Sequence, residues 1–322
     1  MNNSLSRNLA LEAVRITEAA ALSSSLLMGR GDEKAADSNA VNAMRFFLNK
    51  LSIEGTVVIG EGERDNAPML YIGEKVGAGG PKVDIALDPL EGTTITANGG
   101  ENALSVIAMA EDNGFLHSPD VYMDKIAVGK KYEDVDINFD MPPDKIVFNL
   151  SKKSGVDTAN LVVCILDRPR HKELIQDIRK TGARIKLIMD GDVSAVISTT
   201  IEDSGVDLYI GSGGAPEGVL AAAALRCLGG KIIGKLLINN ENEKKRAIKS
   251  GIKDFNKIYS TSELASGDVM FAATGVTDGT LLKGVRITNN IAKTHSIVMR
   301  SKTKTVRFIE AIHNLTNKKI IQ

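Results

Sequence analysis

The sequence predicts an α/β protein whose N-terminal part is α+β and whose C-terminal part is α/β. In the first half of the chain, two apolar helix faces precede several alternating strands with short connections, which is typical of α+β proteins. From Leu161 onward, strands and helices alternate, which predicts right-handed crossovers and a mostly parallel sheet. Consecutive prolines and charges at 140–144 interrupt the pattern, so we predict two domains, 1–143 and 144–322.

Two helices are expected before the first strand. Apolar residues at intervals of three or four, from Leu9 to Ala20, indicate the first helix, and Gly29 is suited to end it. The second helix has an apolar face that runs from Val41 to Leu51. Asp37 precedes this face, and its residue type alone predicts an N-cap.

The strongest local signal lies in the stretch 83–94. Residues 83–88 alternate between aliphatic side chains and Asp or Ala, which is the period of a strand with one apolar face. Pro89 cannot donate to a ladder, so the strand is expected to stop there. Gly92 then permits a turn that other residues resist.

Carboxylates follow two of the expected strands. Asp88 and Glu91 have a backbone carbonyl between them, and this all-oxygen corner suits Mg²⁺ or Mn²⁺. Glu61 ends the strand predicted at 56–59, between glycines that let the backbone bend toward a metal. Thr93 offers a hydroxyl beside them. The alternatives are an acidic surface turn, a solvated acidic loop and a threonine that only caps the next segment.

The C-terminal half is expected to contain regular alternating elements. Its strands are predicted at 161–166, 184–189 and 206–210, and its helices at 171–181, 193–200 and 216–228. An exposed helix is expected at 240–250, and later strands at 269–273, 281–287, 295–300 and 306–312. Ligands of parallel sheets bind beyond the carboxyl ends of the strands, so these ends hold the candidate site residues.

The first two of these strand ends carry charged pairs. Arg168 and Arg170 follow the first strand, and an arginine pair can clamp a phosphate bidentately. Asp190 and Asp192 follow the second strand and can accept hydrogen bonds from sugar hydroxyls. The alternatives are solvated loop charges for the arginines and helix caps for the aspartates.

The third strand end is a glycine-rich loop, 211–215, that opens a helix. Pro216 in the first helical turn and the exposed amides of such a loop are typical of an anion site. Glu217 also lies in this turn, where the helix dipole favours its ionised form; the alternative is an ordinary dipole complement. His171 is interpreted as a loop or cap residue. Three such ends on one sheet favour a functional site.

Composition and charge restrict the partners and the compartment. The chain has 322 residues, of which 40 are basic and 40 acidic, so it has no basic excess for nucleic acid or an anionic membrane. No apolar run reaches membrane-spanning length, and the charged N-terminal region does not fit a signal or transit peptide. Cys164 and Cys227 show no metal or redox spacing. We therefore expect a cytoplasmic protein in which both cysteines are packing residues.

Several motifs resemble those of one enzyme family. The segment Asp88-Pro89-Leu90-Glu91-Gly92-Thr93 resembles the metal signature of the lithium-sensitive sugar and inositol phosphatase superfamily, with Glu91 where many members have Asp. The motifs that narrow the resemblance are Gly60-Glu61-Gly62-Glu63, Ala67-Pro68-Met69-Leu70, Tyr71-Ile72-Gly73-Glu74-Lys75 and Gly213-Gly214-Ala215-Pro216-Glu217-Gly218. Together they resemble class II fructose-1,6-bisphosphatase of the GlpX type over nearly the whole chain. The resemblance implies a layered αβαβα sandwich.

The resemblance also implies roles for residues of this chain. It implies Asp37 and Glu61 as ligands of one Mn²⁺ or Mg²⁺, and Asp88, Glu91 and Glu217 as ligands of a second. It implies that Thr93, helped by a carboxylate for which Asp37 is the candidate, orients or deprotonates the attacking water. The substrate contacts that it implies are Glu91, Gly92, Thr93, Tyr122, Arg168, Pro169, Arg170, Asp190, Gly191, Asp192 and Gly214. The arginines are suited to the non-reacting 6-phosphate, and Tyr122 is otherwise a half-buried core aromatic.

One loop departs from the family pattern. The family usually carries Lys directly after Gly-Asp in the loop 29–34. Glu33 occupies that position here and Lys34 comes one residue later, so no phosphate or metal-bridging role is assigned to a lysine of this loop.

The implied reaction is hydrolysis of the 1-phosphate of fructose 1,6-bisphosphate by two-metal phosphoryl transfer, in gluconeogenesis and glycerol metabolism. The nearest alternative is a phosphatase for sedoheptulose 1,7-bisphosphate, or for both sugars. An inositol monophosphate substrate would not need the distal arginine pair. A non-catalytic sugar-phosphate sensor is the alternative from another class, but binding alone would not require Thr93 and five metal carboxylates. A homo-oligomer, either a dimer or a tetramer, is also expected.

Overall fold

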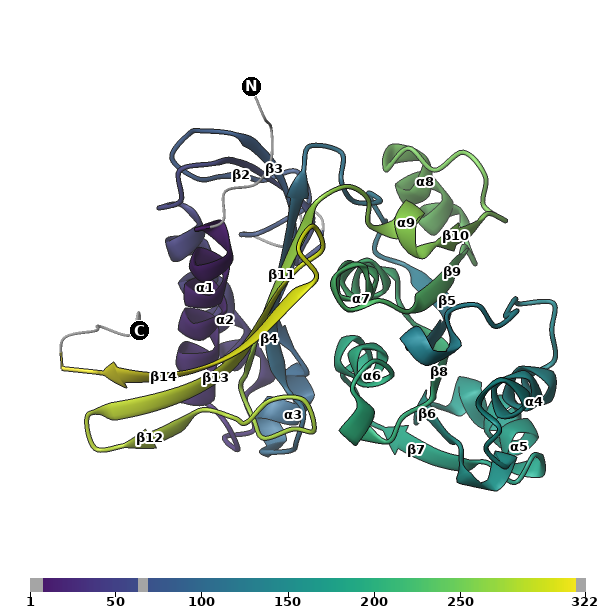
Figure 1. The fold of residues 1–322 in the computed structure, drawn as a ribbon. Helices are drawn as coiled ribbons and strands as arrows, with labels where there is room; N and C mark the ends of the chain where they lie inside the picture. The colour runs from purple at the N-terminus through teal and green to yellow at the C-terminus, as the bar shows by residue number, and fades with distance from the viewer. Residues whose placement is uncertain (1–7, 63–68, 317–322) are drawn as a thin grey trace. The chain divides into compact units, whose positions relative to one another are not determined.

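The chain folds into two compact units. The computed structural model describes residues 8–62 and 69–316, so Glu63 and the pair Ala67–Pro68 of the predicted motifs lie outside the described residues. The first unit comprises 1–117 and 265–322, and the second comprises 118–264 (Figure 1). These bounds differ from the sequence-based division at 143/144, because the chain enters the second unit earlier and returns to the first.

The first unit is built on a mixed sheet with the strand order β12-β13-β11-β4-β3-β1-β2 and with β14 paired to β13. Its helices are α1 (Leu9–Ser25), α2 (Glu33–Leu48) and α3 (Thr93–Asn98). Its strands are β1 (Glu54–Ile59), β2 (Lys75–Val76), β3 (Lys82–Glu91), β4 (Leu104–Glu111), β11 (Val269–Gly275), β12 (Arg286–Thr288), β13 (Ile291–Arg300) and β14 (Thr305–Asn314). Helix α1 ends before the predicted Gly29, and β12 forms only the end of the strand predicted at 281–287.

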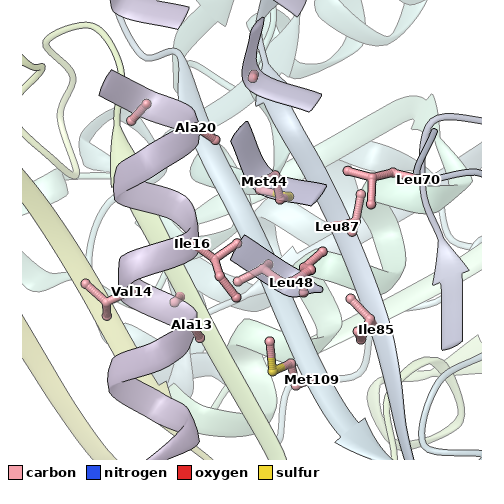
Figure 2. Packing of buried hydrophobic residues seen from close by; sticks show 14 of the residues in the cluster. Ala13, Val14, Ile16, Ala20, Met44, Leu48, Leu70, Ile85, Leu87 and Met109 are labelled. Carbon is pink, nitrogen blue, oxygen red and sulfur yellow. The ribbon is translucent and has the colours of Figure 1, made fainter. Parts of the chain in front are cut away.

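The core of this unit lies between α1, α2 and the sheet. Ile16 and Leu48 from the helices are fully buried, as are Ile85 and Leu87 from β3 (Figure 2). Removing such a side chain is costly: Leu48→Ala is expected to destabilise the protein by about 2–5 kcal/mol. This packing holds β3 rigidly up to the point where its carboxylates begin.

The second unit contains the alternating elements that the sequence predicts. Its strands are β5 (Tyr122–Val128), β6 (Val162–Leu166), β7 (Arg184–Ile188), β8 (Leu208–Gly214), β9 (Lys231–Leu237) and β10 (Ile258–Ser260). Its helices are α4 (Pro143–Ser154), α5 (Lys172–Lys180), α6 (Asp192–Ser198), α7 (Ala215–Leu228), α8 (Glu241–Lys249) and α9 (Thr261–Leu264). Within this unit, α4 and α5 lie on one side of the sheet and α6 and α7 on the other (Figure 1).

The sheet of the second unit is mixed, so the prediction of a mostly parallel sheet was wrong. Its order is β10-β9-β5-β8-β6-β7. Strand β6 is parallel to β7 and β8, as expected, but β5 lies antiparallel between β8 and β9. Strand β5 precedes the predicted domain boundary, and its place in this sheet depends on partners that are distant in sequence.

No helix within 8–62 or 69–316 is both long enough and apolar enough to cross a membrane.

Candidate active site

Strand β3 continues through Pro89 and ends at Glu91, so the prediction that it stops at Pro89 was wrong. On the neighbouring strand β4, Asp88 pairs with Val106 and Glu91 pairs with Leu104. Three steps along β3 therefore match two along β4, which is a β-bulge with one extra residue. A bulge accommodates a proline that has no N–H to donate. The bulge separates the two carboxylates that the sequence places in the predicted metal site.

Gly92 makes the turn that presents Thr93. Its φ of +94° lies in the left-handed region, which favours glycine. Thr93 is the first residue of α3, and the N-cap position is Gly92, where no side chain caps the helix. In the part of the chain that the structure describes, the Thr93 hydroxyl makes no hydrogen bond. The interpretation of Thr93 as a cap is therefore wrong, and its hydroxyl is available for another partner.

Glu61 follows β1 and Asp88 lies near the end of β3, and these two strands run in the same direction. Strands β1 and β3 pair in parallel, with Val57 opposite Ile85, so their C-terminal ends meet at the same edge of the sheet. The backbone N–H of Glu61 donates to the Leu70 carbonyl at 3.0 Å. Both carboxylates are partly buried. The sequence-based prediction of a metal site requires these two carboxylates to lie at the same edge of the sheet, and they do.

Asp37 lies inside α2 and does not cap it, so the prediction of an N-cap was wrong. The N-cap is Asp32, whose carboxylate accepts a hydrogen bond from the Ala35 N–H at 2.9 Å. Asp37 is half-buried in the second turn, and burial raises the pKa of its carboxyl above the ordinary value. Helix α2 packs against β3, which carries Asp88 and Glu91, and against α3, which begins with Thr93. Lys34 is exposed in the first turn of α2.

The carboxylates of the first unit are chemically suited to a hard cation. Glu91 is buried, with 3% of its surface exposed, and burial of a carboxylate disfavours its charged form unless a cation offsets it. Among residues 8–62 and 69–316, no three or more His, Cys, Asp or Glu side chains are grouped so as to hold a metal ion. The metal ligands therefore stay predictions.

In the second unit, Arg170 is exposed but held in place from two sides. Its guanidinium carbon lies 4.7 Å from the ring centre of Tyr122, the first residue of β5. Its Nε and Nη2 donate to the Ser212 carbonyl at 3.1 and 2.6 Å. The Ser212 hydroxyl in turn donates to Asp124. Tyr122 is 49% exposed, so it is not a core aromatic. Among the residues described, the Arg168 side chain hydrogen-bonds only to the carbonyl of its neighbour Asp167, at 3.2 Å.

His171 lies at the N-cap position of α5, which agrees with its interpretation as a loop or cap residue, and its buried ring also crosslinks the ends of two strands. Its Nε2 accepts a hydrogen bond from the Ser212 N–H at 2.8 Å, and its Nδ1 lies 2.7 Å from the Leu166 carbonyl. The ring is therefore neutral, with the proton on Nδ1. Burial lowers the pKa of His171 below its ordinary value. The crosslink holds the end of β8 beside the loop that carries Arg170.

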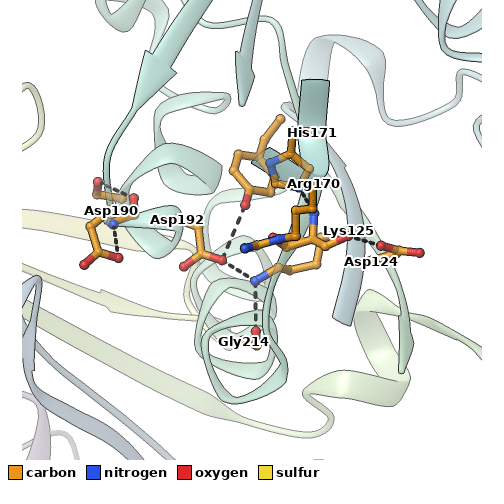
Figure 3. Close-up of polar contacts among 11 residues, drawn as sticks. Asp124, Lys125, Arg170, His171, Asp190, Asp192 and Gly214 are labelled. Carbon is orange, nitrogen blue, oxygen red and sulfur yellow. Dashed lines mark hydrogen bonds and ion pairs between the residues drawn. The ribbon is translucent and has the colours of Figure 1, made fainter. Parts of the chain in front are cut away.

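The two aspartates after β7 lie in different surroundings (Figure 3). Asp190 accepts a hydrogen bond from the Gly191 N–H at 3.2 Å and remains partly exposed. Asp192 is buried and forms an ion pair with Lys125, and its Oδ2 also accepts a hydrogen bond from the Tyr209 hydroxyl at 3.4 Å. Its Oδ1 makes no hydrogen bond within the described chain.

Glu217 lies directly over the backbone of Gly214. A Cβ on Gly214 would lie 1.9 Å from Glu217 Oε2, so a larger residue there would have to displace the Glu217 carboxylate. This oxygen is buried and has no hydrogen-bond partner among the described residues. Burial, together with the charge of Asp192, raises the pKa of Glu217 to about 7. A buried carboxylate oxygen with nothing to bind fits a divalent cation, which takes oxygen ligands.

Sequence reasoning missed Asp124, Lys125, Tyr209 and Ser212. For Lys125 the sequence contains a usable signal: the residue directly precedes the apolar run 126–128, and a buried lysine needs a partner. The other three become site residues only through strand pairing, which brings β5 and β8 together.

The family model and the similar proteins that match this chain point to the same enzyme family. Residues 7–313 match the family model described as bacterial fructose-1,6-bisphosphatase, glpX-encoded. The Escherichia coli protein named fructose-1,6-bisphosphatase 1 class 2 is 45% identical over 326 residues, covering 97% of each chain. Two Synechococcus proteins named D-fructose 1,6-bisphosphatase class 2/sedoheptulose 1,7-bisphosphatase are each 42% identical over 335 residues, covering 96% of each chain.

Proposed function

This chain belongs to the family of bacterial, glpX-encoded fructose-1,6-bisphosphatases, and from this premise we propose that it hydrolyses the 1-phosphate of fructose 1,6-bisphosphate. The products are fructose 6-phosphate and inorganic phosphate, and the pathways served are gluconeogenesis and glycerol metabolism. The main support for the proposal is that the family model matches residues 7–313, a range that includes every predicted site residue.

The non-reacting 6-phosphate is assigned to Arg168 and Arg170. The second arginine supports this assignment because its side chain is exposed and yet fixed by the Tyr122 ring and the Ser212 carbonyl. A preordered guanidinium loses little side-chain entropy when it binds a phosphate. Among the described residues, its Nη1 has no hydrogen-bond partner and can donate to the ligand.

The sugar is assigned to the loop from Asp190 to Asp192. Asp192 Oδ1 can accept a hydrogen bond from a sugar hydroxyl while Oδ2 stays bonded to Lys125. Asp190 is partly exposed and can accept another. A ligand bound this way is held by oriented oxygens and not by flexible surface charges.

The metal ligands are proposed to be Asp37 and Glu61 for one cation, and Asp88, Glu91 and Glu217 for the second. The half-buried Asp37 and the buried Glu217, whose carboxyl pKa values are raised by burial, are suited to this role. When bound, Mn²⁺ or Mg²⁺ supplies charge neutralisation for the transferring phosphoryl group and lowers the pKa of the attacking water.

The attacking water is assigned to Thr93, with Asp37 as the carboxylate that helps. The Thr93 hydroxyl is not used as a helix cap and can accept a hydrogen bond from a water molecule or donate one. Water is then the nucleophile, its proton passes to a protein group, and no covalent enzyme intermediate forms. Gly92 supports this arrangement because its left-handed backbone places Thr93 directly after the bulge of β3.

A second candidate is hydrolysis of sedoheptulose 1,7-bisphosphate, alone or in addition. The two Synechococcus relatives carry both names, which favours testing the two sugars side by side. The alternative from another class is a sensor that binds the sugar phosphate without cleaving it.

A phosphate-release assay separates these functions. The purified chain is incubated with Mn²⁺ or Mg²⁺ and with fructose 1,6-bisphosphate, sedoheptulose 1,7-bisphosphate or an inositol monophosphate. We expect one phosphate per fructose bisphosphate and fructose 6-phosphate as the product. Calorimetric binding of the bisphosphate without phosphate release would instead identify a sensor. Higher turnover of sedoheptulose 1,7-bisphosphate than of fructose 1,6-bisphosphate would make the sedoheptulose compound the main substrate.

We further propose that the protein is cytoplasmic and forms a homodimer or homotetramer. Light scattering on the purified protein measures the oligomeric state directly, and cell fractionation tests the compartment.

A further inference from the structure

Lys125 is a buried cation in the middle of β5. Only 1% of the residue is exposed, and a lysine is rarely buried this completely unless it is paired. Its Nζ donates to Asp192 and to the Gly214 carbonyl, the latter at 2.9 Å (Figure 3). One ammonium group therefore bonds two segments that lie more than 20 residues apart in the sequence.

These two segments carry the substrate and metal residues of the second unit. Asp192 begins α6 immediately after Asp190 and Gly191. Gly214 ends β8 and is the N-cap of α7, whose first turn contains Glu217. Lys125 itself comes from β5, which pairs with β8 and is central in the sheet. The ammonium group thus connects both segments to a rigid strand.

The surrounding packing leaves the connection little freedom. A Cβ on Gly213 would lie 2.3 Å from Asp192 Oδ2 and 2.9 Å from Lys125 Nζ. The Tyr209 hydroxyl lies 3.4 Å from the same Asp192 oxygen and helps to orient the carboxylate. A buried ion pair is weak as a source of stability, because apolar residues of the same volume often serve as well. The stability of the fold therefore does not by itself account for this lysine.

We propose that Lys125 is a positioning residue, which holds the sugar-binding loop 190–192 and the Gly214–Glu217 turn in a fixed relation to each other. The proposal rests on the proposed function, because that function assigns ligands to both segments. Lys125 touches neither substrate nor reacting atoms. It acts through the Asp192 carboxylate and the Gly214 carbonyl, and its loss loosens both segments at once.

The test compares Asp192→Asn with the double variant Asp192→Asn/Lys125→Met. Lys125→Met alone would leave Asp192 as an uncompensated buried charge, which is strongly destabilising. Asp192→Asn leaves the Lys125 ammonium without a carboxylate, but an amide oxygen and the Gly214 carbonyl can still accept its hydrogen bonds. The double variant carries neither buried charge. We expect the double variant to fold and to show a KM for fructose 1,6-bisphosphate about tenfold higher than Asp192→Asn, with a Kd for Mn²⁺ about tenfold weaker, since bonds from a charged donor are the stronger ones. Equal KM and Kd values in the two variants would overturn the proposal.

A second variant does not depend on removing either charge. In Gly213→Ala the new methyl group displaces the ion pair while both charges remain. We expect KM and the Mn²⁺ Kd to rise here too, and wild-type values of both in a folded Gly213→Ala protein would contradict the positioning role even if the double variant does not fold.

The matched control is the buried ion pair of Arg300 with Asp268 in the first unit, which spans 2.7 Å and is similarly buried. Asp268→Asn/Arg300→Met should differ from Asp268→Asn at most in melting temperature, with the same KM and Mn²⁺ Kd. Absence of phosphate release in the wild type would disprove the proposed function. If the wild type releases phosphate, and the Lys125 and Gly213 substitutions change only the melting temperature, the positioning role is disproved and the proposed function stands.

Discussion

The guanidinium of Arg170 lies over the ring of Tyr122, with its central carbon 4.7 Å from the ring centre. The two residues come from the loop after β6 and from the start of β5, and both are exposed. A cation over an aromatic ring at an exposed site contributes about 0.5–1 kcal/mol, enough to restrict a surface arginine without burying it. The contact orders the guanidinium group to which we assign the distal phosphate.

Arg170→Ala should raise the KM for fructose 1,6-bisphosphate by about tenfold or more, because hydrogen bonds to charged groups contribute about 1.5–3 kcal/mol. Turnover of a simple phosphate monoester should change little, since it has no distal phosphate. Steady-state kinetics on both substrates measure this. The matched control is Arg184→Ala, which removes another exposed arginine that donates to a backbone carbonyl in this unit. Equal losses on both substrates would show that Arg170 serves the fold or the reacting phosphate.

Tyr122→Phe and Tyr122→Leu separate the ring of this residue from its hydroxyl. Phenylalanine keeps the ring under Arg170, whereas leucine removes both ring and hydroxyl. If the hydroxyl binds substrate, as the resemblance implies, both variants should raise KM, with the larger effect for leucine. A wild-type KM for Tyr122→Phe would restrict the role of Tyr122 to ordering the arginine.

Thr93→Ala should lower kcat by roughly 10²–10⁴-fold, the usual contribution of general acid–base help, with KM and Mn²⁺ affinity close to wild type. Thr93→Ser keeps the hydroxyl and should retain part of the activity. Thr94 is the exposed next residue of α3, and Thr94→Ala is the control for any effect on the helix. A stable, metal-binding and fully active Thr93→Ala protein would rule out the catalytic role.

Glu217→Gln and a chelator test the metal mechanism. EDTA should abolish phosphate release by the wild type, and added Mn²⁺ or Mg²⁺ should restore it. Glu217 carries a buried oxygen without a hydrogen-bond partner among the described residues, so Gln at this position should not reduce the melting temperature of the metal-free protein. It should, however, reduce the stabilisation by Mn²⁺ that binding to the folded state produces. Glu173, an exposed first-turn acid of α5, provides the control Glu173→Gln. Full activity in chelator would contradict the mechanism.

The buried, neutral His171 should make the free energy of unfolding depend on pH. Burial lowers its pKa in the folded protein, whereas the unfolded chain takes up a proton near the ordinary value of 6.5. The stabilisation is therefore complete above about pH 6.5 and falls as the pH decreases toward the folded pKa, by at most about 1.4 kcal/mol per pH unit for one proton. His171→Asn should be less stable than wild type near neutral pH and should lose this component of the pH dependence. Unfolding followed by circular dichroism at a series of pH values measures both, and an unchanged slope in the variant would contradict the buried neutral ring.

Local features were predictable from the sequence because they depend on interactions over a few residues. The alternation at 83–88 predicts β3, and Gly92 is required where the chain turns with a positive φ. The helix that begins near Pro216 follows from its proline and glycine positions. The errors have different causes. Pro89 enters a bulge that the pairing with β4 creates, whereas α2 begins one turn earlier than the apolar pattern indicates, so Asp32 and not Asp37 is its local cap.

The sequence by itself determined the family, the acidic residues after β1 and at the end of β3, and the charged residues after β6 and β7, because each motif is contiguous in the chain. Only the tertiary structure decided that β5 lies between β8 and β9, and that Lys125 therefore meets Asp192 and Gly214. It also decided that His171 joins Leu166 to Ser212. These contacts depend on which strands pair, and strand pairing is set by the burial of whole sheet faces, which no single segment of the sequence encodes.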